Sequence, residues 1–179
     1  MDHRDAVGLL RNAPLEKGAP QRWADLGCGT GTFTRALADL LPPGSSIAAM
    51  DRDATALKLV PEMHGTTRIT KHHGDFVTDA LPATDLDGIL LANALHFVRD
   101  QPDFIRSVRG SLEPAGALLL VEYDMDNPNP WVPHPVSFAT LERLFKDAGF
   151  GTAKRLAERP SAFGGARLYA AWAERDGAE

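Results

Sequence analysis

Arg22-Trp23-Ala24-Asp25-Leu26-Gly27-Cys28-Gly29-Thr30-Gly31 is the stretch that decides the fold of this chain. Its apolar first half is typical of a buried strand. The glycines that follow lack a Cβ, so the backbone can turn tightly or approach a ligand closely there. Apolar residues then recur at helical spacing over 31–41, which predicts a helix. A strand, a glycine loop and a helix in this order direct backbone N–H groups and a helix N-terminus towards a polar, nucleotide-like ligand.

The spacing of the glycines separates the possible ligands. A dinucleotide fingerprint has its third glycine three residues after the second, and Thr32 occupies that position here. The phosphate-binding loop that ends in Gly-Lys-Ser/Thr is absent from the sequence as well. The string from Asp25 to Gly31, with its acidic residue two positions before the first glycine, instead resembles the first motif of class I S-adenosylmethionine (SAM)-dependent methyltransferases.

Further strand-like runs follow in the order that this resemblance implies, each with polar residues at its end. Asp51 ends the second run and is placed to accept hydrogen bonds from both ribose hydroxyls. The resemblance implies that Asp75 meets the adenine amino group, that Phe76 packs on the adenine ring, and that Asn93 and Ala94 contact the methionine half. The predicted cofactor-binding residues are Asp25, Gly27, Cys28, Gly29, Gly31, Asp51, Arg52, Asp75, Phe76, Asn93 and Ala94.

Three of these predictions have a structural alternative. Asp51 could cap a helix, but Asp53 can fill that role and leave Asp51 free. Asp75 could belong to a plain turn after Gly74. We expect Asp25 to order the glycine loop through hydrogen bonds rather than to contact the methionine amino group, and Cys28 to be a small packing residue rather than a nucleophile.

Strands and helices alternate along the chain, which predicts a Rossmann-like, doubly wound α/β fold. The sheet is expected to be mainly parallel and seven-stranded, with helices on both faces and a C-terminal antiparallel hairpin over 151–174, whose turn is 161–165. The predicted strands are 22–27, 46–51, 67–73, 87–92, 116–123, 151–160 and 166–174, and the main helices are 31–41, 53–63 and 100–112. Between Asp75 and Leu86 only ten residues remain, so we expect a turn or a loop there.

Two segments outside this alternation are expected to border the substrate. Residues 1–21 should hold a short helix, about Asp5 to Asn12, that serves as a small lid. Residues 125–136 contain four prolines, which prevent regular structure and make a stiff loop on the substrate side. A helix capped by Ser137 and ending at Gly149 follows. The whole chain, 1–179, is interpreted as one SAM-binding methyltransferase domain.

The composition limits the partners. With 179 residues, 44% hydrophobic and 24% charged, the chain suits one ordinary globular domain. Its net charge of −5 argues against a nucleic-acid partner, and no apolar stretch is long enough to span a membrane. The single cysteine and the charged N-terminus without a secretory apolar region favour the cytoplasm. We expect a small-molecule acceptor as the partner and allow a homodimer.

Catalytic residues are harder to predict, because methyl transfer mainly requires alignment of a nucleophile with the methyl group. His96 is the candidate base, since it follows the fourth strand and imidazole titrates near neutral pH. Its alternative is to pack or cap the next helix. Tyr123 and Asp124 end the fifth strand, where either could orient the acceptor, and Asp124 could instead cap a turn. Trp131 is expected either to wall the substrate or to pin its loop to the core.

We expect no metal site. His72 and His73 are adjacent, so on a strand they face opposite sides and cannot easily share an ion. The metal-dependent catechol-type methyltransferases place carboxylates after the fourth and fifth strands, whereas here the fourth run ends in Asn93. Asp124 and its polar neighbours Asp126 and Asn127 leave a divalent ion open as an alternative.

The leading functional interpretation is therefore transfer of a methyl group from SAM to a small oxygen, nitrogen or sulfur nucleophile, which yields S-adenosylhomocysteine (SAH). Two alternatives remain. The same fold can use SAM or decarboxylated SAM for other chemistry, such as aminopropyl transfer or cyclisation. The chain could also be a catalytically inactive partner subunit, which the unbroken glycine and acidic positions disfavour.

Overall fold

The computed structural model describes residues 1–15, 18–161 and 165–177. The strands are β1 (Arg22–Leu26), β2 (Ser46–Asp51), β3 (Met63–His64), β4 (Thr67–His73), β5 (Leu86–Ala92), β6 (Leu112–Tyr123), β7 (Lys154–Pro160) and β8 (Arg167–Glu174). The helices are α1 (His3–Leu10), α2 (Thr32–Leu40), α3 (Ala54–Leu57), α4 (Gln101–Arg109) and α5 (Phe138–Asp147), with a 3-10 turn at Leu95–Phe97.

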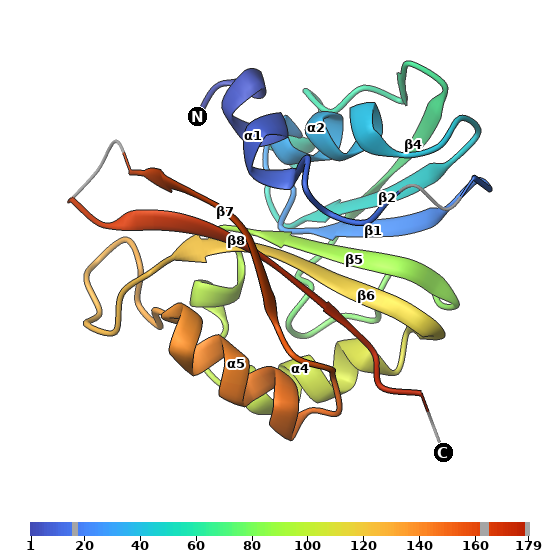
Figure 1. The fold of residues 1–179 in the computed structure, drawn as a ribbon. Helices are drawn as coiled ribbons and strands as arrows, with labels where there is room; N and C mark the ends of the chain where they lie inside the picture. The colour runs from blue at the N-terminus through green and yellow to red at the C-terminus, as the bar shows by residue number, and fades with distance from the viewer. Residues whose placement is uncertain (16–17, 162–164, 178–179) are drawn as a thin grey trace.

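The strands form one sheet in the order β3-β4-β2-β1-β5-β6-β8-β7 (Figure 1). The strands from β4 to β6 pair in parallel, and β8 and β7 add an antiparallel hairpin at one edge. The chain leaves β1 towards β2 and β4 and later returns to the other side of β1 with β5 and β6. This reversal confirms the predicted doubly wound fold, which places loops from both halves at the carboxyl edge of the sheet.

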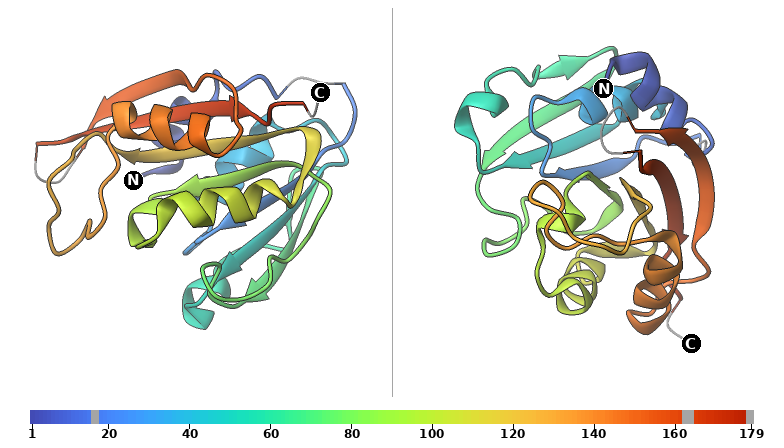
Figure 2. Two further views of the ribbon diagram at one scale, coloured as in Figure 1. Left: turned by 90° about the horizontal axis from the view of Figure 1, so that it is seen from below. Right: turned by 90° about the vertical axis from the view of Figure 1, so that its left-hand side faces the viewer.

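Helices cover both faces of the sheet. Alternate residues of β6 show how this is built: Leu119 and Val121 pack in the layer that contains α1 and α2, and Leu118 and Leu120 pack in the layer that contains α4 and α5. In Figure 1 these layers lie above and below the sheet, and Figure 2 shows α4 and α5 side by side on one face. Burial on both faces explains the continuous apolar run Ala117–Val121 within β6.

One predicted helix is wrong. The helix expected over 53–63 ends at Leu57, and residues 63–64 instead form β3, which pairs antiparallel with β4 and raises the strand number of the sheet to eight. Pro61 stands within the predicted helix. A proline disfavours the helical conformation of the residue before it, so the helix ends earlier. Gly65 then takes a positive φ of 56°, which turns the chain from β3 into β4.

The observed bounds of the other helices and strands differ from the predicted bounds by a few residues. α1 begins at His3 rather than near Asp5, because Asp2 caps it by accepting the Asp5 N–H. The segment between Asp75 and Leu86 contains no helix, as predicted. Residues 162–164 of the expected hairpin turn lie outside the described residues. None of the helices in the described part of the chain has the length and apolar character needed to cross a bilayer.

Gly88→Ala is expected to destabilise the fold by about 1–3 kcal/mol. A Cβ at Gly88 would lie 2.2 Å from Cη2 of Trp23, whose buried indole donates to Gln21 Oε1 and cannot move aside. Urea unfolding followed by circular dichroism measures the effect. Gly8→Ala on α1 is the control, because a Cβ there meets nothing within 4 Å. Equal midpoints for Gly88→Ala and the unchanged chain would contradict this packing.

Candidate active site

A cleft of about 280 Å³ lies at the carboxyl edge of the sheet, between the loops that follow β1, β2, β4 and β5. It is lined by Gly27, Asp51, Arg52, Asp75, Phe76, Val77, Thr78, Asn93, Ala94 and Phe97. Most of the residues predicted to bind the cofactor are therefore brought together. The predicted residues Asp25, Cys28, Gly29 and Gly31 are not among the lining residues, and neither are His96 and Tyr123.

Gly27 lets the loop after β1 lie directly on the floor of the cleft. Its φ is +77°, and a Cβ added there would be 3.0 Å from the Ala94 Cβ and 3.1 Å from Cε1 of Phe76. Any side chain at this position would fill the space beside the loop and strain the backbone. The glycine therefore allows the loop to pack closely against Ala94 and Phe76 at the edge of the cleft.

Asp51 joins the glycine loop to the end of β2. Its Oδ2 accepts the Gly29 N–H at 2.7 Å, and its Oδ1 accepts the Asp53 N–H at 2.8 Å. Asp53 caps α3 by accepting the Thr55 and Ala56 N–H groups, so the helix cap does not need Asp51, as predicted. Each carboxylate oxygen can accept a second hydrogen bond, which leaves Asp51 able to bind a ligand in the cleft.

The prediction that the loop N–H groups face a ligand is wrong for Gly27, Cys28, Gly29 and Gly31. Gly27 and Cys28 both donate to the Met50 carbonyl, at 2.8 and 3.1 Å, and Gly31 donates to the Cys28 carbonyl at 2.9 Å. The Gly29 N–H is taken by the carboxylate at the end of β2. The loop thus folds back onto β2, and these four N–H groups are not free donors for a ligand.

Asp25 is fully buried, and the prediction that it orders the glycine loop through hydrogen bonds is wrong. Its Oδ2 accepts the Thr34 hydroxyl of α2 at 2.6 Å, and its Oδ1 has no partner among the described residues. Burial raises the pKa of Asp25 to about 7, and the nearby charge of Asp51 adds to the rise while the Thr34 hydrogen bond opposes it. Burial also raises the pKa of the Cys28 thiol, which agrees with a packing residue.

Asp25→Asn is expected to reduce the fall in stability with rising pH. A carboxyl group whose pKa is about 7 in the folded chain and 3.8 when unfolded keeps its proton only in the folded state between these values. Stability therefore falls as pH rises from about 4 to about 7, by up to about 4 kcal/mol, and then levels off. Urea unfolding at pH 5 and pH 8 should show the variant gaining relative to the unchanged chain. Parallel pH profiles would contradict the buried carboxyl.

The residues after β4 form a turn that also lines the cleft. Asp75 Oδ1 accepts the Val77 N–H at 2.9 Å, and Oδ2 lies 3.9 Å from the Arg52 guanidinium. Phe76 packs edge-on against Phe104, with ring centroids 5.6 Å apart. Asp75 therefore belongs to a turn, and its carboxylate also borders the cleft, so the turn is compatible with a role in binding adenine. Its contact with adenine stays a prediction.

Asn93, after β5, is held in an unusual conformation at the cleft. Its φ is +53°, which few residues other than glycine adopt, and its N–H donates to the Val121 carbonyl at 2.8 Å. The side-chain Oδ1 is buried without a partner among the described residues. A buried amide oxygen of this kind is a ready acceptor for a donor group on a ligand.

His96 lies beside the cleft and is paired with a carboxylate that the sequence analysis did not assign. His96 Nδ1 lies 2.7 Å from Glu122 Oε2, and the His96 N–H donates to Oε1 at 3.2 Å. The side chain of His96 is 4% exposed and that of Glu122 is 0% exposed. The ring also lies 4.3 Å from that of Phe97, which lines the cleft, and 6.0 Å from that of Tyr123.

The side chain at the end of β6 is tied to neighbouring elements. Asp124 accepts the Phe138 N–H at the start of α5 and pairs with Arg155, and contact of Asp124 or Tyr123 with an acceptor stays a prediction.

Trp131 is 79% exposed, so it does not pin the loop to the core, and its role as a substrate wall stays a prediction. The loop is held by the buried side chain of Val132 and by the His134 N–H, which donates to the His96 carbonyl at 3.0 Å.

The family of the chain follows from comparison with known proteins. Residues 24–120, more than half of the chain, match the family model described as "Methyltransferase domain". The chain belongs to this family, which confirms the resemblance to class I SAM-dependent methyltransferases.

Curated relatives and a solved structure agree with the family. The chain is 37% identical over 107 residues to acetylserotonin O-methyltransferase of Mus musculus, covering 55% of this chain and 27% of that protein. It is 32% identical over 111 residues to trans-aconitate 2-methyltransferase of Mycolicibacterium gilvum, covering 62% and 41%. The matched part of the chain thus spans less than half the length of each of these relatives. The YcgJ protein from Bacillus subtilis shares the fold, with a TM-score of 0.73 at 14% identity over 98% of this chain and 100% of that one.

The cleft fits SAM. The cofactor presents hydrogen-bond donors on its ribose, adenine and methionine parts, and the cleft presents acceptors on Asp51, Asp75 and Asn93. The buried, unpartnered Oδ1 of Asn93 at the lining of the cleft is a feature that a bound molecule would complete.

Proposed function

We propose that this chain transfers the methyl group of SAM to a small-molecule nucleophile and releases SAH. The observation that carries the proposal is the cleft of acidic and amide acceptors with the buried His96–Glu122 pair beside it. When bound, SAM supplies an electrophilic methyl group on a sulfonium. Asp51 would hold the ribose, Asp75 the adenine amino group and Asn93 the methionine half.

The His96–Glu122 pair supports an acceptor that must lose a proton. An ionised carboxylate only accepts hydrogen bonds, so Glu122 takes the Nδ1–H of His96 and leaves Nε2 with its lone pair. Nε2 has no hydrogen-bond partner among the described residues. As the acceptor oxygen forms its bond to the methyl carbon, His96 would take the hydroxyl proton on Nε2. A hydroxyl is therefore favoured over a thioether or a free amine, which need no base.

The rim of the cleft supports an acceptor with an apolar part. Phe97 is 51% exposed and Val77 is 44% exposed, and both line the cleft. Large apolar side chains left open at a cleft are typical of ligand-binding surfaces. The names of the two curated relatives, acetylserotonin O-methyltransferase and trans-aconitate 2-methyltransferase, likewise denote small organic acceptors. A cytoplasmic location, a homodimer and the absence of nucleic-acid partners belong to the same proposal.

The proposal is tested by SAH release from SAM with panels of small phenols and other hydroxyl compounds, matched with thiols and amines of similar size. We expect SAH with hydroxyl acceptors, in amounts equal to the methylated product. Formation of methylthioadenosine from decarboxylated SAM would favour aminopropyl transfer instead. Tight SAM binding with no SAH from any panel would favour the inactive partner subunit.

A further inference from the structure

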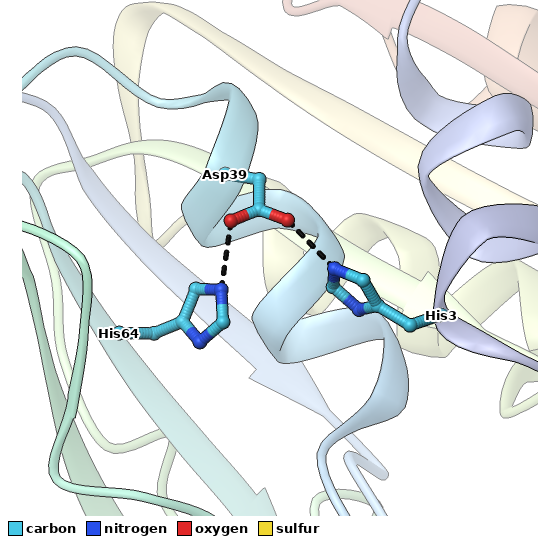
Figure 3. A group of neighbouring side chains, drawn as sticks. All are labelled: His3, Asp39 and His64. Atoms are coloured by element: carbon cyan, nitrogen blue, oxygen red, sulfur yellow. Dashed lines mark hydrogen bonds and ion pairs between the residues drawn. The ribbon is translucent and has the colours of Figure 1, made fainter.

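Two histidines and an aspartate meet at a second place in the molecule. His3 comes from α1, Asp39 from the last turn of α2 and His64 from β3, and their side chains point toward one another (Figure 3). Nε2 of His3 lies 2.7 Å from Oδ2 of Asp39, and Nε2 of His64 lies 2.7 Å from Oδ1 of the same carboxylate. One ligand atom from each residue lies within 4.8 Å of the other two.

The cluster is open to solvent and carries a charge that an ion could use. Its side chains are 42%, 40% and 28% exposed for His3, Asp39 and His64. Asp39 is bonded to both histidines, and an exposed aspartate carboxylate is ionised at neutral pH. In the described part of the chain no lysine or arginine pairs with it. Arg35, one turn earlier on α2, donates to the Thr30 carbonyl instead.

The donor set matches one class of ion. Imidazole nitrogens with a carboxylate suit Zn²⁺ and the neighbouring divalent transition metals, whereas Ca²⁺ and Mg²⁺ prefer oxygen ligands alone. Bonds of about 2.0–2.2 Å in a tetrahedral site place ligand atoms roughly 3.3 Å apart. The two nitrogen–oxygen distances here are 2.7 Å and all three ligand atoms lie within 4.8 Å of one another, so side-chain movements would be enough to arrange them around an ion. Nδ1 of His3 is buried without a partner, which leaves Nε2 as the accessible nitrogen of that ring.

We propose that His3, Asp39 and His64 bind one divalent transition-metal ion, with water completing its coordination. The ion would join the N-terminal helix α1 to α2 and to the β3–β4 hairpin. Asp39 lies seven residues after Thr32, about 10 Å along α2 from the glycine loop. The site is therefore structural and independent of methyl transfer. The expectation of no metal considered His72, His73 and the residues after the fourth and fifth strands, whereas these three residues come from α1, α2 and β3.

The probe is Zn²⁺ alone, titrated calorimetrically into the full chain without an affinity tag and after EDTA treatment. We expect one ion per chain and a higher melting temperature with Zn²⁺, because the ion binds only the folded state. His3→Ala and His64→Ala should each weaken binding by about 10–100-fold. His72→Ala is the control and should bind as the unchanged chain does, because His72 contacts Thr70 on β4 and lies outside the cluster.

Two results would overturn the proposal. One is the absence of Zn²⁺ binding by the folded, unchanged chain. The other is binding that survives in both His3→Ala and His64→Ala. Asp39→Asn keeps the shape of the side chain, so weaker Zn²⁺ binding in this variant could not be assigned to loss of folding. Visible absorption with Co²⁺ is a separate test. The strong bands of four-coordinate Co²⁺ should appear with the unchanged chain and be absent with Asp39→Asn.

Discussion

Replacing His96 by asparagine is expected to lower kcat by about 10²–10⁴-fold, with SAM binding close to that of the unchanged chain. The Nδ2 of asparagine can take the place of the imidazole Nδ1 and keep the hydrogen bond to Glu122, but asparagine has no second, basic nitrogen. The loss therefore reports the missing base and not a missing packing contact. Initial rates of SAH release with a hydroxyl acceptor measure it, and calorimetry measures SAM binding.

Two further variants separate catalysis from structure. Glu122→Gln should lower kcat by a smaller factor, because an amide can present its NH₂ group to His96 and favour the wrong tautomer. His134→Asn is the control: the backbone N–H of His134 donates to the His96 carbonyl, and the side chain has no role in the proposal. Full activity of His96→Asn would show that the His96–Glu122 pair is a structural contact.

Replacing Asp51 by alanine is expected to weaken SAM and SAH binding by about 100-fold or more. The carboxylate would accept hydrogen bonds from the ribose, and hydrogen bonds to charged groups contribute about 1.5–3 kcal/mol each. The same change releases the Gly29 N–H and loosens the loop beside the cleft. Calorimetric titration of both ligands into the variant and the unchanged chain measures the difference.

The neighbourhood of Asp51 offers matched controls. Asp53→Ala removes an acid two residues away that caps α3 and does not line the cleft, so it should keep ligand binding and lose only a little stability. Asp51→Asn keeps one acceptor oxygen for the Gly29 N–H, so it should bind more tightly than Asp51→Ala and less tightly than the unchanged chain. Equal affinity of Asp51→Ala and the unchanged chain would remove Asp51 from the site.

Features encoded by neighbouring residues could be predicted from the sequence. The strand, glycine loop and helix over 22–41 follow from local patterns, and Asp51 and Asn93 were found because each ends an apolar run. In a parallel sheet all such ends meet at one edge, so the cleft followed from the strands alone. The helix expected over 53–63 failed because Pro61 and the turn at Gly65 outweighed the apolar spacing.

Features that depend on tertiary contacts were missed. Glu122 is separated from His96 by 26 residues, and only the pairing of β5 with β6 brings them together. A single acidic residue in the apolar run that ends at Tyr123 was the available signal. The orientation of the loop N–H groups depended on how the glycine loop folds onto Met50 of β2, which no spacing rule describes.

Calorimetric titration of the unchanged, folded chain with SAM and with SAH tests the central claim most directly, because every role assigned to the cleft depends on the cofactor. The account predicts that both ligands bind at one site per chain, with dissociation constants in the micromolar range. Absence of binding by either ligand at millimolar concentration would contradict it and would mean that this cleft serves another molecule.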